Sequence, residues 1–510
     1  MRRRTPATRS TRSRRSARLL GASAAIIAGA GALRVLCGVA FANYDTLYAL
    51  AWGGQLARGE SPAYAVPIAP TPHPLLELLG LVLYPLGART TEDVAVALGF
   101  VALSACGWVI YRLGAQWFGR AAGAVAALIF LTRDPVLSWG VRAYVDVPYL
   151  ALVLAALLVE SRSRRAGAPV LALLATAGLL RPEAWAFSAI YWLYLVDPVA
   201  LARTRARRLA SASDGAGAST PARARIERGR LLGLTALAAS APLLWVLSDL
   251  VITGDALWSL SHTQHTAEAL GRKTGIANVP LYVPRRIGEV LRVPVLAGAV
   301  LGAGLSLAWL RGRALPAAAA GVLALAVFAG FASLGLPINT RYAALSAAIL
   351  CLFCGAGVAG WLGLRRDDRR RRRWMAAGAV LALALLAYAP ASYRGASREL
   401  GKLEREQHIE DELVALVRDG AITLRCGRVG VPNHAPIPLL ALYMRTSPRN
   451  IVSPEAGSIR SGVYVDPASR KVEEDYVLDR NDPHERVSIP RGFREVSANR
   501  SWRIYMRCGA

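Results

Sequence analysis

Residues 43–76 read NYDTLYALAWGGQLARGESPAYAVPIAPTPHPLL and follow directly on the first hydrophobic stretch of the chain. This segment is far more polar, aromatic and proline-rich than the sequence on either side of it. It opens with an acid, continues as an amphipathic run and ends in a His-Pro turn. An acid in this place lies at the boundary between lipid and water, which makes Asp45 the first candidate functional residue.

The composition indicates a multispanning membrane protein. The 510 residues are 54% hydrophobic and yet carry a formal net charge of +27. A soluble protein could not cover so much apolar surface. The apolar residues fall in blocks of membrane-spanning length, and arginine clusters separate some of these blocks. Nucleic-acid binding, the other explanation of such basicity, would place basic residues along one soluble face.

The arginine clusters predict the orientation of the chain. Residues 1–18 contain eight arginines and no acid, which places the N-terminus in the cytoplasm and makes the helix at about 19–42 cross outward. We interpret this helix as a retained anchor, because its apolar run is longer than the roughly 7 to 15 residues of a cleaved signal peptide.

Alternating the remaining blocks between the basic clusters predicts about eleven transmembrane helices. The expected spans are 19–42, 93–111, 121–134, 147–160, 167–180, 184–196, 231–252, 293–310, 316–335, 343–363 and 375–390. A further helix at 74–88 is expected to lie on the outer surface. This topology makes 43–92 and 253–292 outer loops, and 199–230 a disordered cytoplasmic loop suited to anionic headgroups.

The tail from 391 to 510 differs from the membrane part at 19–390. Its charges are mixed in sign and it has short alternating runs such as 502–506, so we expect a small soluble α+β domain on the outer face. Its only cysteines, Cys426 and Cys508, are a disulfide candidate in an oxidising compartment. The other cysteines lie in spans and are expected to be buried thiols rather than metal ligands. Abundant Ala, Gly and Arg with three lysines suggests a bacterial plasma membrane protein.

Further polar residues are expected on the outer face or near it. Arg34 lies inside the first span, where a cation is costly unless it is paired. The others are His73, Arg142, Asp146, Lys273, Arg341 and Tyr342. Structural explanations remain open for several of them. Asp45 and Asp146 are suited to helix capping, His73 to rigidifying a proline turn, and Arg341 to anchoring at the interface. The run 181–183 suggests a hairpin tip with an internal ion pair.

The order of these elements resembles that of a known superfamily. The chain has an arginine in its first helix and Asp45 at the start of the first outer loop. The elements that follow are Gly-x-x-Pro-x-Tyr at 59–64, His-Pro at 73–74, Tyr-x-Asp-x-Pro at 144–148, Leu-Arg-Pro-Glu at 180–183 and Arg-Tyr at 341–342. Over about residues 20–390 the chain resembles the GT-C membrane glycosyltransferases that use polyprenyl-phosphate sugars, especially the protein-mannosyltransferase-like group.

This resemblance implies a mainly α, GT-C-like fold and a role for each matching residue. Asp45 would act as general base or align the acceptor, which would be a glycan, a lipid or a protein. Arg142, Arg341 and Lys273 would bind the phosphate of the lipid donor. Asp146 would contact sugar hydroxyls. The remaining candidates, His73, Arg34 and Tyr342, would complete the substrate pocket.

The chain also departs from the superfamily. Many relatives have paired acids after the first helix, which suits a divalent metal, whereas Thr46 follows Asp45 here. The sequence therefore does not support a metal cofactor. The His-Pro-Pro turn of relatives is His-Pro-Leu, and no long second soluble module is present. Acceptor recognition beyond the membrane core would then fall to the tail.

Two other classes of function remain as alternatives. A lipid or sugar transporter would show broken spans paired across an internal repeat, with acids near the middle of the membrane. No such pairing is evident, and the acids lie at the outer edge. A noncatalytic assembly or acceptor-binding protein would use the tail as its interface and would not depend on Asp45.

Overall fold

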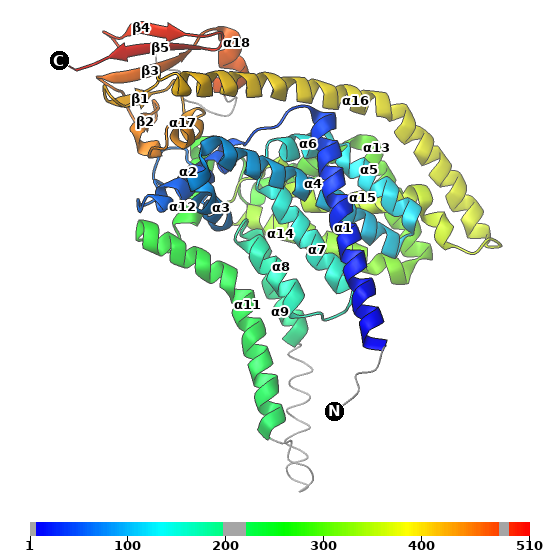
Figure 1. The fold of residues 1–510 in the computed structure, drawn as a ribbon. Coiled ribbons are helices and arrows are strands. Elements are labelled where there is room, and N and C mark those ends of the chain that lie inside the picture. Colours follow the sequence, from blue (N-terminus) through cyan, green and yellow to red (C-terminus); the bar gives the residue numbers. More distant parts are fainter. Residues whose placement is uncertain (1–6, 197–220, 479–488, 510) are drawn as a thin grey trace.

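The computed structural model describes residues 7–196, 221–478 and 489–509 and is mainly helical (Figure 1). In these residues, seven helices are long and apolar enough to cross a membrane, or eight if the bent pair α5 and α6 is one span. The helices of the membrane part are α1 (Ala7–Cys37), α4 (Ala88–Trp117), α5 (Arg120–Leu131), α6 (Asp134–Val141), α7 (Asp146–Arg162), α8 (Ala168–Gly178), α9 (Glu183–Val196), α11 (Pro221–Thr253), α13 (Val279–Trp309), α14 (Arg311–Ser333), α15 (Ala344–Ala359) and α16 (Arg369–Arg418).

Each predicted span coincides with one of these helices, and the mainly helical fold is confirmed. Because several of these helices are shorter than a full span, the number eleven stays a prediction. The loops between them carry the short helices α2 (Tyr44–Ala57), α3 (Pro74–Leu83), η1 (Tyr84–Leu86), α12 (Trp258–Ala269), η2 (Ile276–Asn278), η3 (Thr340–Ala343) and η4 (Gly360–Gly363). The predicted helix at 74–88 corresponds to α3 with η1. The predicted disordered loop at 199–230 lies outside the described residues up to 220, and its last ten residues, 221–230, form the start of helix α11 instead.

Helix α15 forms the centre of the bundle. In the most apolar 18-residue stretch of this span, 83% of the residues are buried inside the protein. It packs closely against α13, because an added Cβ at Gly302 would lie 1.8 Å from the carbonyl oxygen of Phe353. Small residues that let two backbones approach are the usual basis of helix association in membranes. Helix α11 is different, because only 11% of the residues in its most apolar 18-residue stretch are buried. It stands at the edge of the bundle (Figure 1).

Two of the membrane helices are broken. Helices α5 and α6 meet at an angle of 68°, and α13 is interrupted at Arg292, whose φ is 63°. A proline follows each break, at Pro135 and Pro294, where it fits a new first turn. Asp134 and Arg292 form an ion pair at 3.2 Å, which links the two broken helices at their breaks.

Helix α16 joins the membrane part to a small α/β domain. It runs for 50 residues, so the boundary predicted at 391 falls inside a continuous helix. The domain's sheet consists of β1 (Arg428–Gly430), β2 (Ile451–Val452), β3 (Gly462–Pro467), β4 (Arg494–Ala498) and β5 (Trp502–Arg507) in the order β2-β1-β3-β5-β4. Strands β2, β1 and β3 are parallel, and β5 is antiparallel to both β3 and β4. Its short helical elements are α17 (Ile437–Tyr443), η5 (Pro448–Asn450), α18 (Arg470–Val472) and the π-helical turn η6 (Glu473–Val477).

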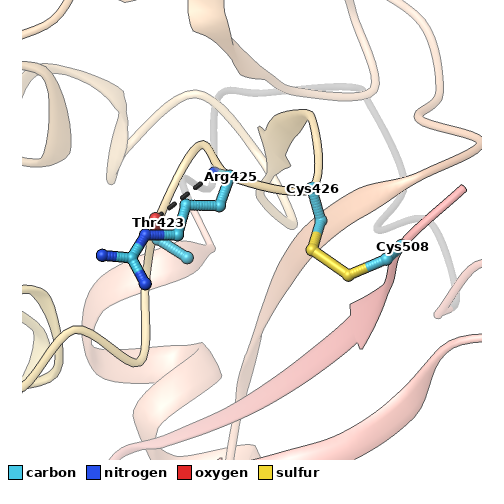
Figure 2. Close-up of a disulfide and its surroundings, with 4 residues drawn as sticks. All are labelled: Thr423, Arg425, Cys426 and Cys508. Atoms are coloured by element: carbon cyan, nitrogen blue, oxygen red, sulfur yellow. Dashed lines mark hydrogen bonds between the residues drawn. A yellow bond between two sulfur atoms is a disulfide. The ribbon is translucent and has the colours of Figure 1, made fainter.

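The C-terminal domain has an internal disulfide and also makes direct contacts with the membrane part. Figure 2 shows the disulfide between Cys426 and Cys508, which joins the segment before β1 to the end of β5. The hydroxyl of Tyr443 donates to Glu92 at 2.5 Å, and the guanidinium of Arg445 lies 4.0 Å from the centre of the Tyr84 ring. These contacts hold α17 against α2, α4 and η1.

Candidate active site

A cavity of about 1540 Å³ lies between the membrane helices and the C-terminal domain. Its wall combines the start of α2, the segment 68–73, α12, the turn before α15, the second half of α16 and two loops of the C-terminal domain. The segment that opened the sequence analysis therefore forms one side of a large cavity. A cavity of this size can enclose a lipid headgroup together with a second substrate.

Asp45 is held in the first turn of α2 with its carboxylate at this cavity. The cap of α2 is Asn43, whose side-chain oxygen accepts from the backbone N–H groups of Asp45 and Thr46. The hydroxyl of Thr46 donates to the carbonyl of Ala143 at 2.8 Å, which fixes the start of α2 against the end of α6. Asp45 is therefore not the helix cap that the sequence left open, and its side chain is available for other contacts.

Arg341 pairs with Asp45. Its Nη1 lies 2.6 Å from Oδ2 of Asp45, and both side chains are mostly buried. Burial is the largest single influence and would raise the pKa of the Asp45 carboxyl, but the charge and hydrogen bond of Arg341, together with His73 and Arg272, lower the pKa below its ordinary value. The carboxylate is therefore ionised at neutral pH. The two residues are 296 positions apart in the chain.

Behind this pair lies a buried network of charges. Arg181 donates to Asp146 and to Glu183, and its guanidinium stacks 3.9 Å from the centre of the Tyr342 ring. Oδ2 of Asp146 lies 3.8 Å from Nε of Arg341, so Asp146 connects Arg181 to the Asp45 pair. The run 181–183 thus has the predicted internal ion pair, but it also fixes Asp146, which the sequence did not indicate.

His73 lines the same cavity from the start of α3. It is 7% exposed, and its Nδ1 has no hydrogen-bond partner among the described residues. Its backbone N–H donates to Glu77 at 3.1 Å, and Glu77 in turn accepts from the hydroxyl of Tyr64. Burial lowers the pKa of His73 to about 4, so its imidazole is neutral at pH 7.

The other predicted cations differ in position. Arg142 lines the cavity but pairs with Glu406 of α16 at 2.8 Å and stacks on Tyr144. Lys273 is not among the lining residues, whereas its neighbour Arg272 is. Arg34 lies on α1 away from the cavity and donates to the carbonyl of Gly38. The structure therefore brings Asp45, His73, Arg142, Arg341 and Tyr342 to one cavity, with Asp146 directly behind, but not Arg34 or Lys273.

Several lining residues were not found by sequence reasoning. They come from α16 and the C-terminal domain and include Glu406, Glu410, His434, Asp475 and Tyr476. No motif marks them, because they reach the cavity only through the docking of a domain that follows in the chain.

The donor set does not fit a divalent metal. Among the residues that the structure describes, no group of three or more His, Cys, Asp or Glu side chains is placed to hold one. Asp45 and Asp146, which both contact Arg341, are each paired with an arginine. A metal ion would have to displace these guanidinium groups, and we assign no step to one.

The helical bundle, with its large cavity against a small C-terminal α/β domain, has a fold that is known from solved structures. Of the solved structures, the crystal structure of ArnT from Cupriavidus metallidurans bound to undecaprenyl phosphate is similar to this chain over 94% of its length and 97% of that of ArnT. The TM-score is 0.53 and the sequence identity 14%. No protein-family model and no curated protein matches the sequence. The GT-C fold that the ordered motifs implied is confirmed by this similarity.

Proposed function

We propose that this protein is an integral membrane glycosyltransferase that moves a sugar from a polyprenyl-phosphate donor to a hydroxyl group of an acceptor. The observation that carries the proposal is the Asp45–Arg341 pair at the wall of the outer cavity. One carboxylate and one guanidinium at 2.6 Å supply both a proton acceptor and a phosphate ligand. The shared fold with ArnT, whose structure holds undecaprenyl phosphate, supports this type of donor. Whether the sugar is a hexose, such as mannose, or a pentose is left to experiment.

The lining of the cavity suits such a donor. Its lining includes apolar residues of α9, α11, α12 and α14 and the segments beside them: Trp185, Trp245, Val246, Leu257, Leu260, Phe331 and Leu334. Arg272 and Arg341 line the same cavity. A polyprenyl chain matches the apolar surface, while its phosphate matches Arg341 and Arg272. In this arrangement Arg272 takes the role that the sequence suggested for Lys273.

The reaction is a displacement at the anomeric carbon of the sugar. The acceptor oxygen forms a bond to this carbon as the bond to the phosphate oxygen breaks, and polyprenyl phosphate leaves with the bonding electrons. Asp45 takes up the proton of the acceptor hydroxyl as its oxygen becomes acidic. An arriving phosphate would also compete with Asp45 for Arg341. Asp45 would then lose part of its neutralising partner, and its pKa would rise toward a value better suited to a base.

The orientation of the site follows from the charges. The arginines at 9–18 belong to the first half of α1 and those at 369–373 to the start of α16, whereas the C-terminal domain follows the other end of α16 (Figure 1). We place these ends in the cytoplasm, and the cavity and the C-terminal domain outside it, in a bacterial plasma membrane.

The proposal is tested with the variant Asp45→Asn in lipid. Purified protein is incubated with a panel of undecaprenyl-phosphate-linked sugars, and consumption of the donor is followed. We expect the wild type to consume one donor and Asp45→Asn to lose roughly 10²- to 10⁴-fold in rate, as for removal of a general base. Asp93→Asn is the matched control, because Asp93 is exposed and pairs with Arg89 away from the cavity. Full turnover by Asp45→Asn would contradict the role of Asp45, and no turnover by the wild type would favour a noncatalytic protein.

A further inference from the structure

The turn that carries Arg341 is held by side chains of a neighbouring helix. Arg341 lies in η3, within the connection between α14 and α15, where no long helix or strand fixes the backbone. Two residues of α13, Arg286 and Glu289, contact this connection just before Arg341 in the chain. We name these two residues the α13 pair.

The α13 pair bonds the connection at two points. Nε of Arg286 donates to the carbonyl oxygen of Ile338 at 2.9 Å, and the hydroxyl of Thr340 donates to Oε2 of Glu289 at 2.7 Å. Nη1 of Arg286 also donates to both carboxylate oxygens of Glu289, at 3.0 and 2.8 Å, so each side chain orients the other. Because Arg341 follows Thr340 directly, these bonds fix the backbone from which its side chain extends.

The same connection is bonded to the segment that carries a second arginine of the cavity. The backbone N–H of Ile338 donates to the carbonyl oxygen of Lys273 at 2.8 Å, and Arg272 directly precedes Lys273. Ile338 is buried, and both Arg272 and Arg341 line the cavity. The bond from Arg286 to Ile338 therefore lies behind a unit that presents both arginines to the cavity.

The α13 pair itself lies outside the cavity. The lining includes Thr340 and Arg341 but neither Arg286 nor Glu289. The pair can therefore act on bound substrates only through the residues that it holds. Positioning of this kind matters for rate, because a misplacement of about 1 Å caused by a remote change can cost on the order of 10²-fold.

We propose that Glu289, oriented by Arg286, is a positioning residue that holds Arg341 at ion-pair distance from Asp45 and in place for the donor phosphate. The inference rests on the proposed glycosyltransferase function and concerns the same site. Arg341 and Asp45 are 2.6 Å apart, and the attraction between two charges falls as their distance grows. Loss of the bond to Glu289 would therefore weaken the effect of Arg341 on Asp45 and on the phosphate together.

The experiment compares Glu289→Ala and Glu289→Gln with the wild type in lipid, using the donor that the wild type consumes. We expect Glu289→Ala to raise the KM for the donor and to lower kcat/KM roughly 10- to 100-fold. The acidic limb of its pH profile should move up by about half a pH unit, because the burial of Asp45 is then less opposed. Arg272 and His73, which also lower the pKa of Asp45, are unchanged in this variant. Glu289→Gln keeps an oxygen that accepts from Thr340, so it should recover part of the loss.

A matched pair of arginines tests the contact with the turn. Arg285 and Arg286 both contact Glu289, and Arg285 is 62% exposed. Of the hydrogen bonds between described residues, one joins Arg286 to the turn and none joins Arg285 to it. Arg286→Gln should therefore lower kcat/KM about fivefold or more, whereas Arg285→Gln should stay within about twofold of the wild type. Equal losses in the two variants would overturn the inference.

A double variant separates positioning from a general structural role. Because Glu289 acts through Arg341, adding Glu289→Ala to Arg341→Gln should lower kcat/KM by less than about twofold. Fully multiplicative losses, or an unmoved acidic limb in Glu289→Ala, would overturn the inference while donor consumption by the wild type upheld the proposed function. If Glu289→Ala did not fold, Thr340→Val would remove the same bond, with Thr340→Ser as the rescue and the same outcomes. A wild type that consumes no donor would remove both proposals.

Discussion

At the scale of single residues, Arg341 governs the charge state of Asp45. Burial of the Asp45 carboxyl acts to raise its pKa, and the guanidinium of Arg341 2.6 Å away is the main one of the groups that together lower it below its ordinary value. In Arg341→Gln burial would be largely unopposed, so the pKa of Asp45 should rise above 3.8. We expect the acidic limb of the pH profile of kcat/KM to move up by about one pH unit or more.

The control for this prediction is Arg341→Lys, which keeps a positive charge beside the carboxylate. Its acidic limb should lie close to that of the wild type, although the loss of bidentate geometry should raise the KM for the donor. If the limb did not move in Arg341→Gln, a group other than Asp45 would be the base.

The buried position of His73 leads us to expect that the stability of the folded protein depends on pH. Its pKa is about 4 in the folded protein and near 6.5 when unfolded, so the unfolded chain takes up a proton first as the pH falls. The folded state should therefore lose roughly 2 kcal/mol between pH 6.5 and pH 5 through this residue. Unfolding midpoints in detergent at these two pH values measure the loss.

The variant His73→Gln should remove most of this pH dependence, because the amide does not titrate. His408→Gln serves as the control, since His408 is 62% exposed in its side chain. An equal loss of stability on acidification in the wild type and in His73→Gln would show that His73 does not titrate as its burial requires.

Sequence reasoning identified the single residues with strong local context. Asp45 and His73 are in a polar segment between spans, and Arg341 is in a short turn, so topology alone placed them on one side. Sequence reasoning could not distinguish Lys273 from Arg272. In an irregular segment, neighbouring side chains point in different directions, and no repeating pattern shows which of the two faces the cavity. Arg34 is not among the residues that line the cavity and donates locally to the carbonyl of Gly38, so its role in a substrate pocket stays a prediction.

At the scale of elements, the contact between α13 and α15 depends on one glycine. A Cβ at Gly302 would clash with the backbone of Phe353 and Gly357, which cannot move without shifting α15. Gly302→Ala should therefore destabilise the bundle by about 1–3 kcal/mol. Gly304→Ala in the same helix should not, because nothing lies within 4 Å of its added Cβ. Unfolding midpoints of the two variants measure the difference, and equal midpoints would contradict the predicted packing.

Hydropathy predicted the membrane helices well but not where helices end. The apolar pattern stops near residue 390, and the sequence therefore suggested a domain boundary at 391. Helix α16 continues to Arg418 because helix propagation needs only backbone hydrogen bonds and a supporting face. That face is provided by Leu403, Ile409 and Leu413, which are buried against the C-terminal domain and α17. The sequence feature that marks the second half of α16 is the helical spacing of its apolar residues, not a high mean hydropathy.

At the scale of the whole molecule, the complete cavity could not be derived from the sequence. The side of the cavity that α16 and the C-terminal domain form depends on contacts between distant segments, such as the hydrogen bond from Tyr443 to Glu92 across 351 positions. Such docking contacts have no local pattern. What the sequence did indicate is that the tail has to share the compartment of the site, because all predicted outer loops and the tail lie on one side of the predicted membrane.

This sidedness is the last prediction, and α16 provides the test. Residues 365–373 contain seven arginines, and the 50-residue helix α16 begins among them at Arg369. At about 75 Å it is far longer than the roughly 30 Å thickness of the hydrocarbon core of a bilayer. Its second half must therefore project from the membrane, and the positive-inside rule directs it outward. Alkaline phosphatase fused after Leu364 should be inactive and the same enzyme fused after Arg418 active, with green fluorescent protein giving the reverse result. The disulfide between Cys426 and Cys508 agrees with this direction, since disulfides persist in oxidising compartments. The opposite pattern of fusion activity would put the cavity in the cytoplasm, where Asp45 would meet cytoplasmic acceptors instead.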